Sequence, residues 1–330
     1  MSIKHVPVLH DEVINYLQPK PGQNFIDCTL GGGGHSKAIL EKTAPHGKLL
    51  AIDMNEETFD EAKGNLINLK ERIFFHQGNF SKLKEIYDER FNLYKISGIL
   101  LDLGFSSLEL EDKNRGFSFQ IDGPLDMRYD RRQSLTAEEI VNTWSFDKLK
   151  KVIQEYGQER LAHEITKKII NSRLNKKITK TKKLVEAILL AFREKLGTDR
   201  EVPWIGGIHP ATRTFQALRI AVNDEINNLR QVLPQAIDLL EPGGRLAVIS
   251  FHSLEDKIVK NFFREEAKDC HCPPEAIVCI CDHQASIRLI TKKPIPATAE
   301  EIKTNPRARS AKMRVAEKLK QNDKNNKKIQ

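Results

Sequence analysis

The chain has 330 residues, of which 39% are hydrophobic and 30% are charged, with a formal net charge of +8. This composition is typical of a soluble protein, and no stretch approaches the roughly 18 consecutive apolar residues of a membrane helix. The first residues contain no apolar secretory segment, and the five cysteines do not resemble a secreted disulfide framework. We therefore expect a cytoplasmic protein that does not enter membranes, and its positive charge permits a polyanionic partner.

The opening residues, 6–17, have apolar side chains at helical spacing and predict a short helix that ends at a turn, 19–22. An apolar run at 24–27 then ends in an aspartate, and four glycines at 31–34 turn the chain before a helical pattern begins at 35. A strand, a glycine turn and a helix in this order are typical of the start of a nucleotide-binding βαβ unit.

Asp53 ends a second predicted strand, 48–53, about twenty residues after the glycine turn. At that spacing an acidic side chain commonly binds the two hydroxyls of a ribose. The three-glycine pattern of dinucleotide sites is incomplete, because Ser36 or Lys37 stands where the third glycine would fall. An adenosine ligand without a pyrophosphate therefore fits better than NAD, and a purely structural glycine turn is the alternative.

Strands and helices continue to alternate as far as position 102. Helices are predicted over 56–69 and 82–91, and apolar runs at 72–76 and 96–102 predict the third and fourth strands. The fourth run is apolar almost throughout, as parallel strands buried on both faces tend to be. The pattern predicts an α/β fold with a doubly wound, Rossmann-like sheet.

The fifth convincing strand, 244–250, follows only after a long helical pattern over 215–240. The connection between the fourth and fifth strands is too long for one crossover by roughly a hundred residues, and the surplus carries helix signals of its own. We therefore expect a helical substrate-recognition domain over 108–214. It is inserted into an α/β domain formed by 1–107 and 215–330.

Basic residues gather in two segments, one in the inserted domain and one in the C-terminal tail. A single basic run is most often a solvated helix face. Two such segments around one ligand site make nucleic-acid binding as good an interpretation as a solvated surface. The first comprises Lys167, Lys168, Arg173, Lys176, Lys177, Lys180, Lys182 and Lys183, and the second comprises Lys303, Arg307, Arg309, Lys312, Arg314, Lys318, Lys320, Lys324, Lys327 and Lys328.

Phrases spread over nearly the whole chain carry a family resemblance. They read DCTLGGGGHS at 27–36, RGFSF at 115–119, GPLDMR at 123–128, HPATRTFQALRI at 209–220, SFHSLED at 250–256 and NPRARS at 305–310. In this order they resemble the bacterial 16S ribosomal RNA cytosine-N4 methyltransferases of the MraW (RsmH) type, a class I S-adenosylmethionine-dependent family. The resemblance implies methyl transfer from S-adenosylmethionine to the N4 amine of a cytidine in 16S rRNA, in the decoding region of the assembled small subunit.

The same resemblance implies roles for individual residues in cofactor binding. The glycine turn and the residue after it would contact the methionine and ribose parts of the cofactor, through Gly33, Gly34 and His35. Asp53 would bind the ribose hydroxyls and Phe80 would lie against the adenine, although a core aromatic is the alternative for Phe80. The family usually has a glutamine contact where this chain has Glu109, and an ionised glutamate accepts hydrogen bonds but does not donate them.

Asp102 is the candidate catalytic residue, and the resemblance also places it in the cofactor site, beneath the methyl donor. An acceptor that takes the protons of the N4 amine would help to direct its lone pair toward the methyl group. The segment after the fourth strand lacks the Pro-Pro-aromatic phrase of many amino methyltransferases, so the acceptor is a hypothesis and a helix cap is the alternative. We expect Phe105 or another aromatic residue to stack on the base.

Several other polar residues stand near these phrases. Arg115, Arg128, Arg213 and Arg219 are candidates for ordering RNA, and structural ion pairs are the equal alternative. For His252 and Glu255 a role as general base competes with a helix cap at Ser253, which we favour.

Cys270, Cys272, Cys279 and Cys281 form two Cys-x-Cys pairs. Four thiols supply a tetrahedral zinc site, although these gaps are tighter than usual, and redox-active or reduced surface cysteines are the alternatives. Methyl transfer does not need such a metal. We expect the remaining cysteine, Cys28, to pack in the core.

Three other functions stay open from the sequence. A DNA amino-methyltransferase is disfavoured by the missing Pro-Pro phrase, and an NAD-dependent oxidoreductase is disfavoured by the incomplete glycine pattern. A non-catalytic, RNA-binding ribosome assembly factor would be separated from an enzyme by cofactor titration and a methyl-transfer assay. A homodimer is also among the expectations.

Overall fold

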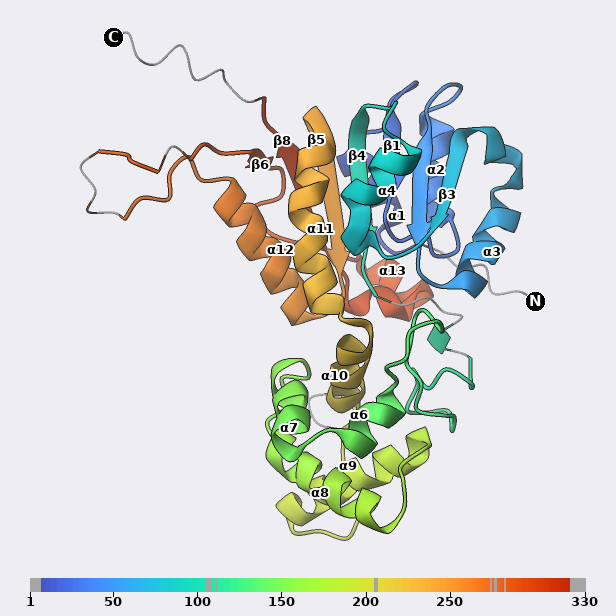
Figure 1. Ribbon diagram of the computed structural model, residues 1–330, viewed down its shortest axis with the longest axis vertical. Coiled ribbons are helices and arrows are strands. Elements are labelled where there is room, and N and C mark those ends of the chain that lie inside the picture. The colour runs from blue at the N-terminus through green and yellow to red at the C-terminus, as the bar shows by residue number, and fades with distance from the viewer. Residues whose placement is uncertain are drawn as a thin grey trace. The chain divides into compact units, whose positions relative to one another are not determined.

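The computed structural model describes residues 7–104, 109–110, 112–204, 207–273, 275, 278–281 and 283–320. The chain divides into two compact units (Figure 1). The sheet unit comprises Met1–Gly104 and Asn227–Gln330, and the helical unit comprises Phe105–Ile226. The helical unit extends beyond the expected insertion, 108–214, mainly because the helix after residue 211 packs with it.

One eight-stranded sheet forms the centre of the sheet unit, in the order β3-β2-β1-β4-β5-β8-β6, with β7 paired to β8. The first five strands are mutually parallel, and β8 runs antiparallel to its neighbours. The strands are β1 (Asn24–Asp27), β2 (Leu49–Asp53), β3 (Ile73–Gln77), β4 (Ile96–Asp102), β5 (Leu240–Ser250), β6 (Ile287–Leu289), β7 (Ile295–Pro296) and β8 (Lys312–Lys318).

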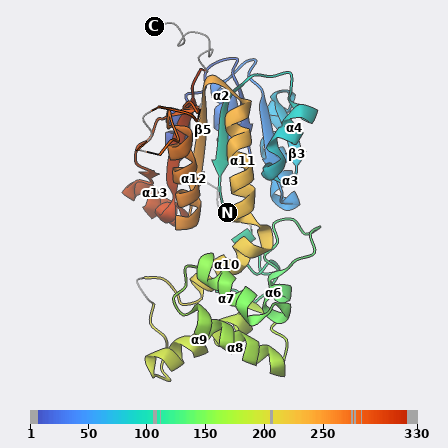
Figure 2. The same ribbon diagram turned by 60° about the vertical axis from the view of Figure 1, so that its left-hand side comes forward.

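Helices cover both faces of the sheet (Figures 1 and 2). Side chains alternate along β4, so that Ile99 and Leu101 pack with α4, α11 and α12, whereas Leu100 packs with α1, α2 and α3 on the other face. The predicted doubly wound α/β fold is confirmed. These helices are α1 (His10–Leu17), α2 (Gly34–Lys42), α3 (Glu56–Asn65), α4 (Leu83–Arg90), α11 (Glu225–Leu239) and α12 (Ser253–Glu266).

The long helix predicted over 215–240 is two helices, α10 (Thr212–Asn223) and α11. Asp224 ends α10 in the left-handed conformation, with φ of 50°, while its N–H still bonds the carbonyl of Ile220. The predicted strand at 244–250 begins earlier, at Leu240. The break separates α10, which packs in the helical unit, from α11, which packs on the sheet.

The C-terminal segment folds into the sheet unit as far as residue 320. After α13 (Ala299–Thr304) and the 3-10 helix η3 (Pro306–Ser310), β8 pairs with β5 along its length. Arg314 is buried and its Nε lies 2.6 Å from Asp256, and the Nζ of Lys318 donates to the carbonyl of Asp238. These two residues of the basic C-terminal tail therefore have partners within the sheet unit. Residues 321–330 lie outside the described residues.

The helical unit has one core shared by its helices. Thr136 caps α6 (Ala137–Thr143), because its side chain accepts a hydrogen bond from the N–H of Glu139. Arg173 donates to the carbonyls of Val141 and Trp144 at the end of the same helix, so it holds α6 against α8. Besides α10, the helices are α6 (Ala137–Thr143), α7 (Phe146–Glu155), α8 (Ala162–Asn175) and α9 (Thr181–Leu196). Nowhere in the described chain is a helix long and apolar enough to cross a membrane.

Candidate active site

The strand order brings three aspartates to one edge of the sheet. Asp27 ends β1, Asp53 ends β2 and Asp102 ends β4. Because these strands are parallel, their carboxyl ends lie on the same edge, and the order reverses between β1 and β4. In open α/β sheets ligands bind outside the carboxyl ends at such a reversal. The topology therefore selects the surroundings of Asp27, Asp102 and the glycine turn as the binding crevice.

The glycine turn between β1 and α2 has no room for side chains at two positions. Gly33 precedes α2 in the left-handed conformation, with φ of 82°, and a Cβ there would lie 2.9 Å from the Cδ1 of Leu66. A Cβ on Gly34 would lie 2.2 Å from the Cγ of Pro7. Glycine at these positions brings the backbone and the positive end of the α2 dipole to the crevice.

Replacing Gly33 by alanine is expected to destabilise the sheet unit by at least about 1–2 kcal/mol, because alanine disfavours positive φ. The displaced turn should also weaken binding of S-adenosylmethionine, the cofactor that the sequence resemblance predicts for this crevice. Urea unfolding and calorimetric titration with S-adenosylmethionine measure the two effects. The matched control is Gly64→Ala, since Gly64 lies in α3 with no atom within 4 Å of an added Cβ. A Gly33→Ala protein with the stability and affinity of the wild type would refute this account of the turn.

Asp53 is connected to the glycine turn through its carboxylate. The N–H of Gly31 donates to Oδ2 at 2.8 Å, and the N–H of Asn55 donates to Oδ1 at 2.9 Å. The carbonyl of Asp53 accepts the N–H of Gly78, which holds the loop after β3 beside the end of β2. Carboxylate oxygens only accept hydrogen bonds, which is the chemistry that ribose hydroxyls require of a partner.

Phe80 begins the 3-10 helix η2 (Phe80–Lys82) directly after this loop. Asn79 caps the turn, since its Oδ1 accepts the N–H of Ser81 at 2.8 Å. The side chain of Phe80 is partly buried, and it packs against the hydrophobic cluster that includes residues of α4. An adenine contact for this side chain stays a prediction.

Asp102 and His35 form the most distinctive polar pair of the crevice. The Nε2 of His35 lies 3.6 Å from the Oδ2 of Asp102, and the two side chains are 6% and 21% exposed. Both ring nitrogens of His35 and the Oδ1 of Asp102 are buried without a hydrogen-bond partner among the described residues. Buried polar atoms are normally satisfied, so these atoms fit a polar ligand that supplies the missing bonds.

Asp27 helps to fix the backbone segments that carry His35 and Asp102, a role that the sequence analysis missed. Its carboxylate is fully buried and accepts the hydroxyl of Ser36 at 2.6 Å and the N–H of Thr29 at 3.1 Å. Burial raises the pKa of Asp27 above its ordinary value. The hydroxyl oxygen of Thr29 in turn accepts the N–H of Asp102 at 2.7 Å. Asp27 and Thr29 thus fix both the start of α2 and the end of β4.

Glu109 belongs to the helical unit, where its side chain is 5% exposed. Its predicted contact with the cofactor stays a prediction. Phe105, the predicted stacking residue, lies outside the described residues.

The cap of α12 is His252 rather than the predicted Ser253. The Nδ1 of His252 accepts the N–H of Glu255 at 3.4 Å, and the Glu255 carboxylate accepts the N–H groups of Phe251 and His252. This reciprocal arrangement satisfies the first turn of α12. His252 and Glu255 therefore have a structural role as the cap of α12, which is the alternative that the sequence analysis favoured over a general base.

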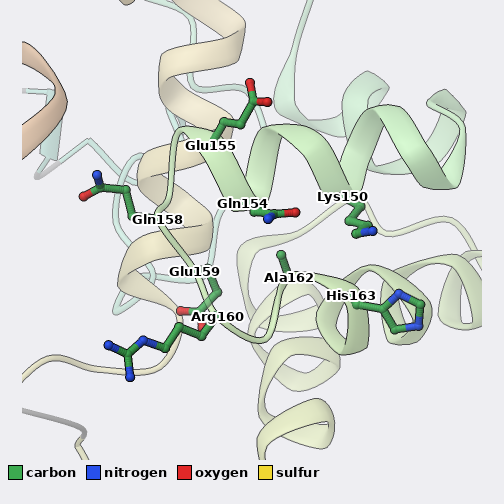
Figure 3. A pocket seen from close by; sticks show the side chains of 8 residues that line it. All are labelled: Lys150, Gln154, Glu155, Gln158, Glu159, Arg160, Ala162 and His163. Atoms are coloured by element: carbon green, nitrogen blue, oxygen red, sulfur yellow. The ribbon is translucent and has the colours of Figure 1, made fainter. Parts of the chain in front are cut away.

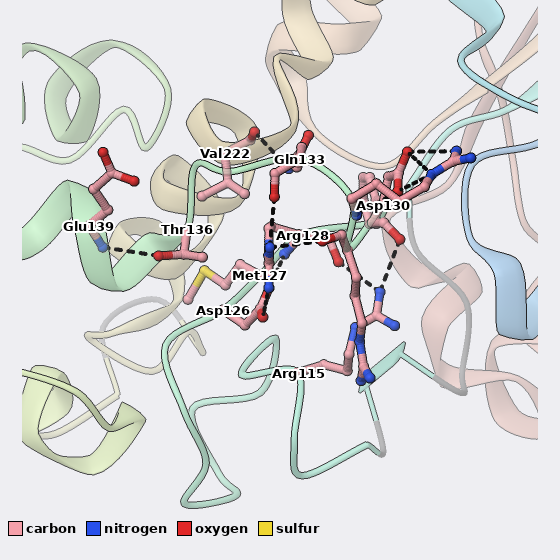
Figure 4. Close-up of polar contacts among 12 residues, drawn as sticks. Arg115, Asp126, Met127, Arg128, Asp130, Gln133, Thr136, Glu139 and Val222 are labelled. Atoms are coloured by element: carbon pink, nitrogen blue, oxygen red, sulfur yellow. Dashed lines mark hydrogen bonds and ion pairs between the residues drawn. The ribbon is translucent and has the colours of Figure 1, made fainter.

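Arg115 is a structural residue of the helical unit rather than an exposed RNA contact. Its side chain is buried, and its Nη2 donates to the carbonyls of Arg128 and Tyr129 at 2.7 and 3.1 Å (Figure 4). Arg128 forms a two-point ion pair with Asp126, at 2.8 and 2.7 Å. Burial acts to raise the pKa of Asp126, but the hydrogen bonds from Arg128 hold it below its ordinary value.

Arg219 likewise forms two hydrogen bonds with Glu225, at 2.8 and 2.9 Å. Arg213 differs, because it is exposed and donates one long hydrogen bond, 3.4 Å to the carbonyl of Gln158. Of the four arginines proposed to order RNA, three are buried or partly buried with short hydrogen bonds, and Arg213 is the most accessible.

The basic segment of the inserted domain divides in the same way. Lys168 pairs with Glu194 and Lys183 pairs with Glu186. Lys180 is exposed as well, and its Nζ lies 3.9 Å from Asp122. The exposed lysines of the segment are Lys167, Lys176, Lys177, Lys180, Lys182 and Lys183.

A polar cavity lies between the end of α7 and the start of α8 (Figure 3). Its lining mixes both charges, and consists of Lys150, Gln154, Glu155, Gln158, Glu159, Arg160, Ala162 and His163. With acidic and basic groups balanced, the cavity carries no preference for a ligand of one charge.

The four late cysteines lie together in the loop between α12 and β6. The Sγ of Cys270 lies 3.4 Å from that of Cys279 and 3.6 Å from that of Cys281, and the Cys272–Cys279 and Cys279–Cys281 distances are 3.9 and 3.6 Å. All four sulfurs lie within 4.8 Å of one another. The amide N–H groups of His271 and His283 lower the pKa of Cys281 to about 6. Cys28 is buried in the core, as expected.

Comparisons with known proteins give one consistent result. The model described as the MraW methylase family matches residues 2–319. A protein named ribosomal RNA small subunit methyltransferase H from Heliobacterium mobile is 45% identical over 97% of this chain and 100% of its own length. The protein of the same name from Thermomicrobium roseum is 47% identical over 97% of this chain and 95% of its own. These likenesses give no support to the DNA-modifying, oxidoreductase or non-catalytic alternatives.

Proposed function

The chain belongs to the MraW methylase family, and from that membership we propose that it methylates the N4 amine of a cytidine in the 16S rRNA of the small ribosomal subunit. The observation that carries the proposal is the near-complete coverage of relatives named small-subunit rRNA methyltransferases. The target cytidine would lie in the decoding region of the assembled subunit. The family resemblance read from the sequence motifs is confirmed.

The cofactor in this proposal is S-adenosylmethionine, which supplies a methyl group on a positively charged sulfur. Gly33, Gly34 and His35 would hold its methionine and ribose parts, and Asp53 would accept the two ribose hydroxyls. Phe80 would cover the adenine, and Glu109 would add an acceptor. The unsatisfied buried nitrogens of His35 support a polar ligand at this point.

Asp102 would act on the nucleophile and also border the cofactor. Methyl transfer to nitrogen is an in-line displacement, so alignment is the main task of the protein. The Oδ1 of Asp102 is buried and has no partner among the described residues, which leaves it available to accept a proton of the N4 amine. The Thr29 hydroxyl fixes the backbone of Asp102 and thereby the direction of this carboxylate.

The RNA would be bound through its phosphates by the exposed lysines of α8 and α9 and by Arg213. Neutralisation of phosphates by lysine and arginine releases counterions, so binding should weaken as salt rises. The target base must leave its stack to reach a pocket of this kind.

The experiment that tests the function uses tritiated S-adenosylmethionine with small subunits that lack their modifications, followed by nucleoside analysis. Label in N4-methylcytidine is the expected result. Cofactor binding without label would move the substrate to DNA or to an earlier assembly intermediate. Failure to bind the cofactor would refute the enzymatic function.

We also propose that Cys270, Cys272, Cys279 and Cys281 hold a structural zinc ion. Zinc bound to sulfur at about 2.3 Å in a tetrahedron places the sulfurs about 3.8 Å apart, and the four sulfur–sulfur distances given above span 3.4–3.9 Å. Backbone N–H groups donate to three of the sulfurs at 3.3 Å, as expected for thiolate ligands. Four protein ligands leave no open position for catalysis.

Purified protein is expected to contain about one zinc ion per chain, because the four thiols match a closed tetrahedral site. Elemental analysis measures the metal, and a Cys270→Ser/Cys281→Ser variant should lose it while keeping methyl-transfer activity. The matched control, Cys28→Ala, alters a core cysteine and should retain zinc. Zinc retention in the double variant would contradict the assignment.

A cytoplasmic location and a homodimer stay predictions. Light scattering would measure whether the protein is a dimer.

A further inference from the structure

Four aromatic rings form a series that runs from the core of the helical unit to its surface. Phe215 is buried in that core, and the ring of Phe119 meets it edge-on with centroids 5.8 Å apart. Phe119 stacks on His209 at 4.6 Å with an interplanar angle of 13°. His209 in turn meets the indole of Trp204 at 5.9 Å and 85°. Trp204, the last of the series, is 59% exposed.

The ring of His209 is held in one orientation. Its Nδ1 accepts the N–H of Ala211 at 3.1 Å, which places the ring directly before α10. Burial lowers the pKa of His209 below its ordinary value, so the ring is neutral at pH 7. With one face against Phe119, this fixed ring is a rigid support for the indole.

The two segments that supply these rings contain the RGFSF and HPATRTF phrases, which the proposed catalytic site does not use. Among the described residues of the second segment, 204–215, the exposed large apolar side chains are Trp204 and Ile208, at 59% and 41%. Two such side chains present far less area than the roughly 800 Å² that each partner contributes to a stable protein interface. A single exposed ring instead matches the face of one nucleobase.

We propose that the indole of Trp204 is a stacking platform for one unpaired base of the RNA substrate, supported by His209 and Phe119. The inference rests on the proposed function, which makes RNA the substrate. Base stacking on aromatic side chains does not depend on base identity, so this contact would add affinity and position the strand without reading its sequence. The exposed lysines of the same unit would bind the phosphates.

The test uses the fluorescence of Trp204. The chain has two tryptophans, so Trp144→Phe leaves Trp204 as the only indole. Phenylalanine keeps an aromatic ring for Lys148, whose Nζ lies 3.6 Å from the centroid of the Trp144 ring. Titration of this variant with a single-stranded oligoribonucleotide should quench its emission to saturation. An abasic strand of the same length, which keeps the phosphates, should not quench it.

The matching affinity measurement uses the protein with both tryptophans. Trp204→Ala should weaken binding of the oligoribonucleotide by about 5- to 100-fold, and Trp204→Phe should recover most of the loss. The dependence of affinity on salt should keep its slope, since no phosphate contact is removed. Equal quenching by the abasic strand, or unchanged affinity in Trp204→Ala, would overturn the platform.

The methyl-transfer assay on the same preparation separates this inference from the proposed function. Methylation by a protein whose indole does not respond to RNA would refute the platform and leave the function standing. Quenching by RNA in a protein that binds the cofactor but never transfers a methyl group would refute the function and leave the platform standing.

Discussion

Asp102→Asn is expected to slow methyl transfer by about 10²–10³-fold while the affinity for S-adenosylmethionine changes little. The substitution keeps the size of the side chain and the backbone bond to Thr29, which involves the N–H of residue 102. It removes the negative charge of the carboxylate, and the amide oxygen that remains accepts a hydrogen bond from the N4 amine but is too weak a base to take up its proton. Single-turnover kinetics and calorimetric titration separate the rate from the affinity.

The control for Asp102 is Asp60→Asn, the same chemical change at a 67% exposed aspartate of α3. Its rate and cofactor affinity should match those of the wild type. The opposite pattern in Asp102→Asn, with cofactor binding lost and the residual turnover per bound cofactor unchanged, would assign Asp102 to the cofactor alone. The role in proton acceptance would then be wrong.

Arg115→Met is expected to destabilise the helical unit by about 3–5 kcal/mol, since hydrogen bonds from a charged donor contribute about 1.5–3 kcal/mol each. The change removes the donors for the carbonyls of Arg128 and Tyr129 and leaves both without this partner. Thermal unfolding followed by circular dichroism measures the loss.

The control for Arg115 is Arg213→Met, at an exposed arginine with one long carbonyl contact. Its stability should stay within about 0.5 kcal/mol of the wild type, as for most surface substitutions. Arg213→Met should instead weaken RNA binding and reduce its salt dependence. An Arg115→Met protein that keeps its stability but loses RNA affinity would reverse the roles of the two residues.

The parallel core of the sheet was predictable because its signals are local. Each buried strand is a short apolar run, and the aspartates that end β1, β2 and β4 mark the carboxyl edge directly in the sequence. The glycine turn adds a backbone requirement that few other residues meet. Asp53 and Asp102 could therefore be selected as site residues without a structure.

The missed features depend on partners far away in the sequence. Arg314 reads as part of a basic tail until Asp256, 58 residues earlier, is placed beside it. Asp224 interrupts an otherwise continuous apolar helical pattern through a left-handed conformation that glycine more commonly marks. The hydrogen bond from the N–H of Asp102 to the hydroxyl of Thr29 joins the end of β4 to the turn after β1, and the two residues are 73 positions apart in the sequence. Local periodicity contains no information on such pairs.

The position of β8 has a consequence for how the protein folds while it is being synthesised. The core of the helical unit comes from one continuous stretch, so this unit has all its residues before β5 is synthesised. The sheet unit must wait, because β8 pairs with both β5 and β6. A nascent chain stalled before Lys312 would present the unpaired edge of β5, which is the kind of edge that recruits chaperones or aggregates.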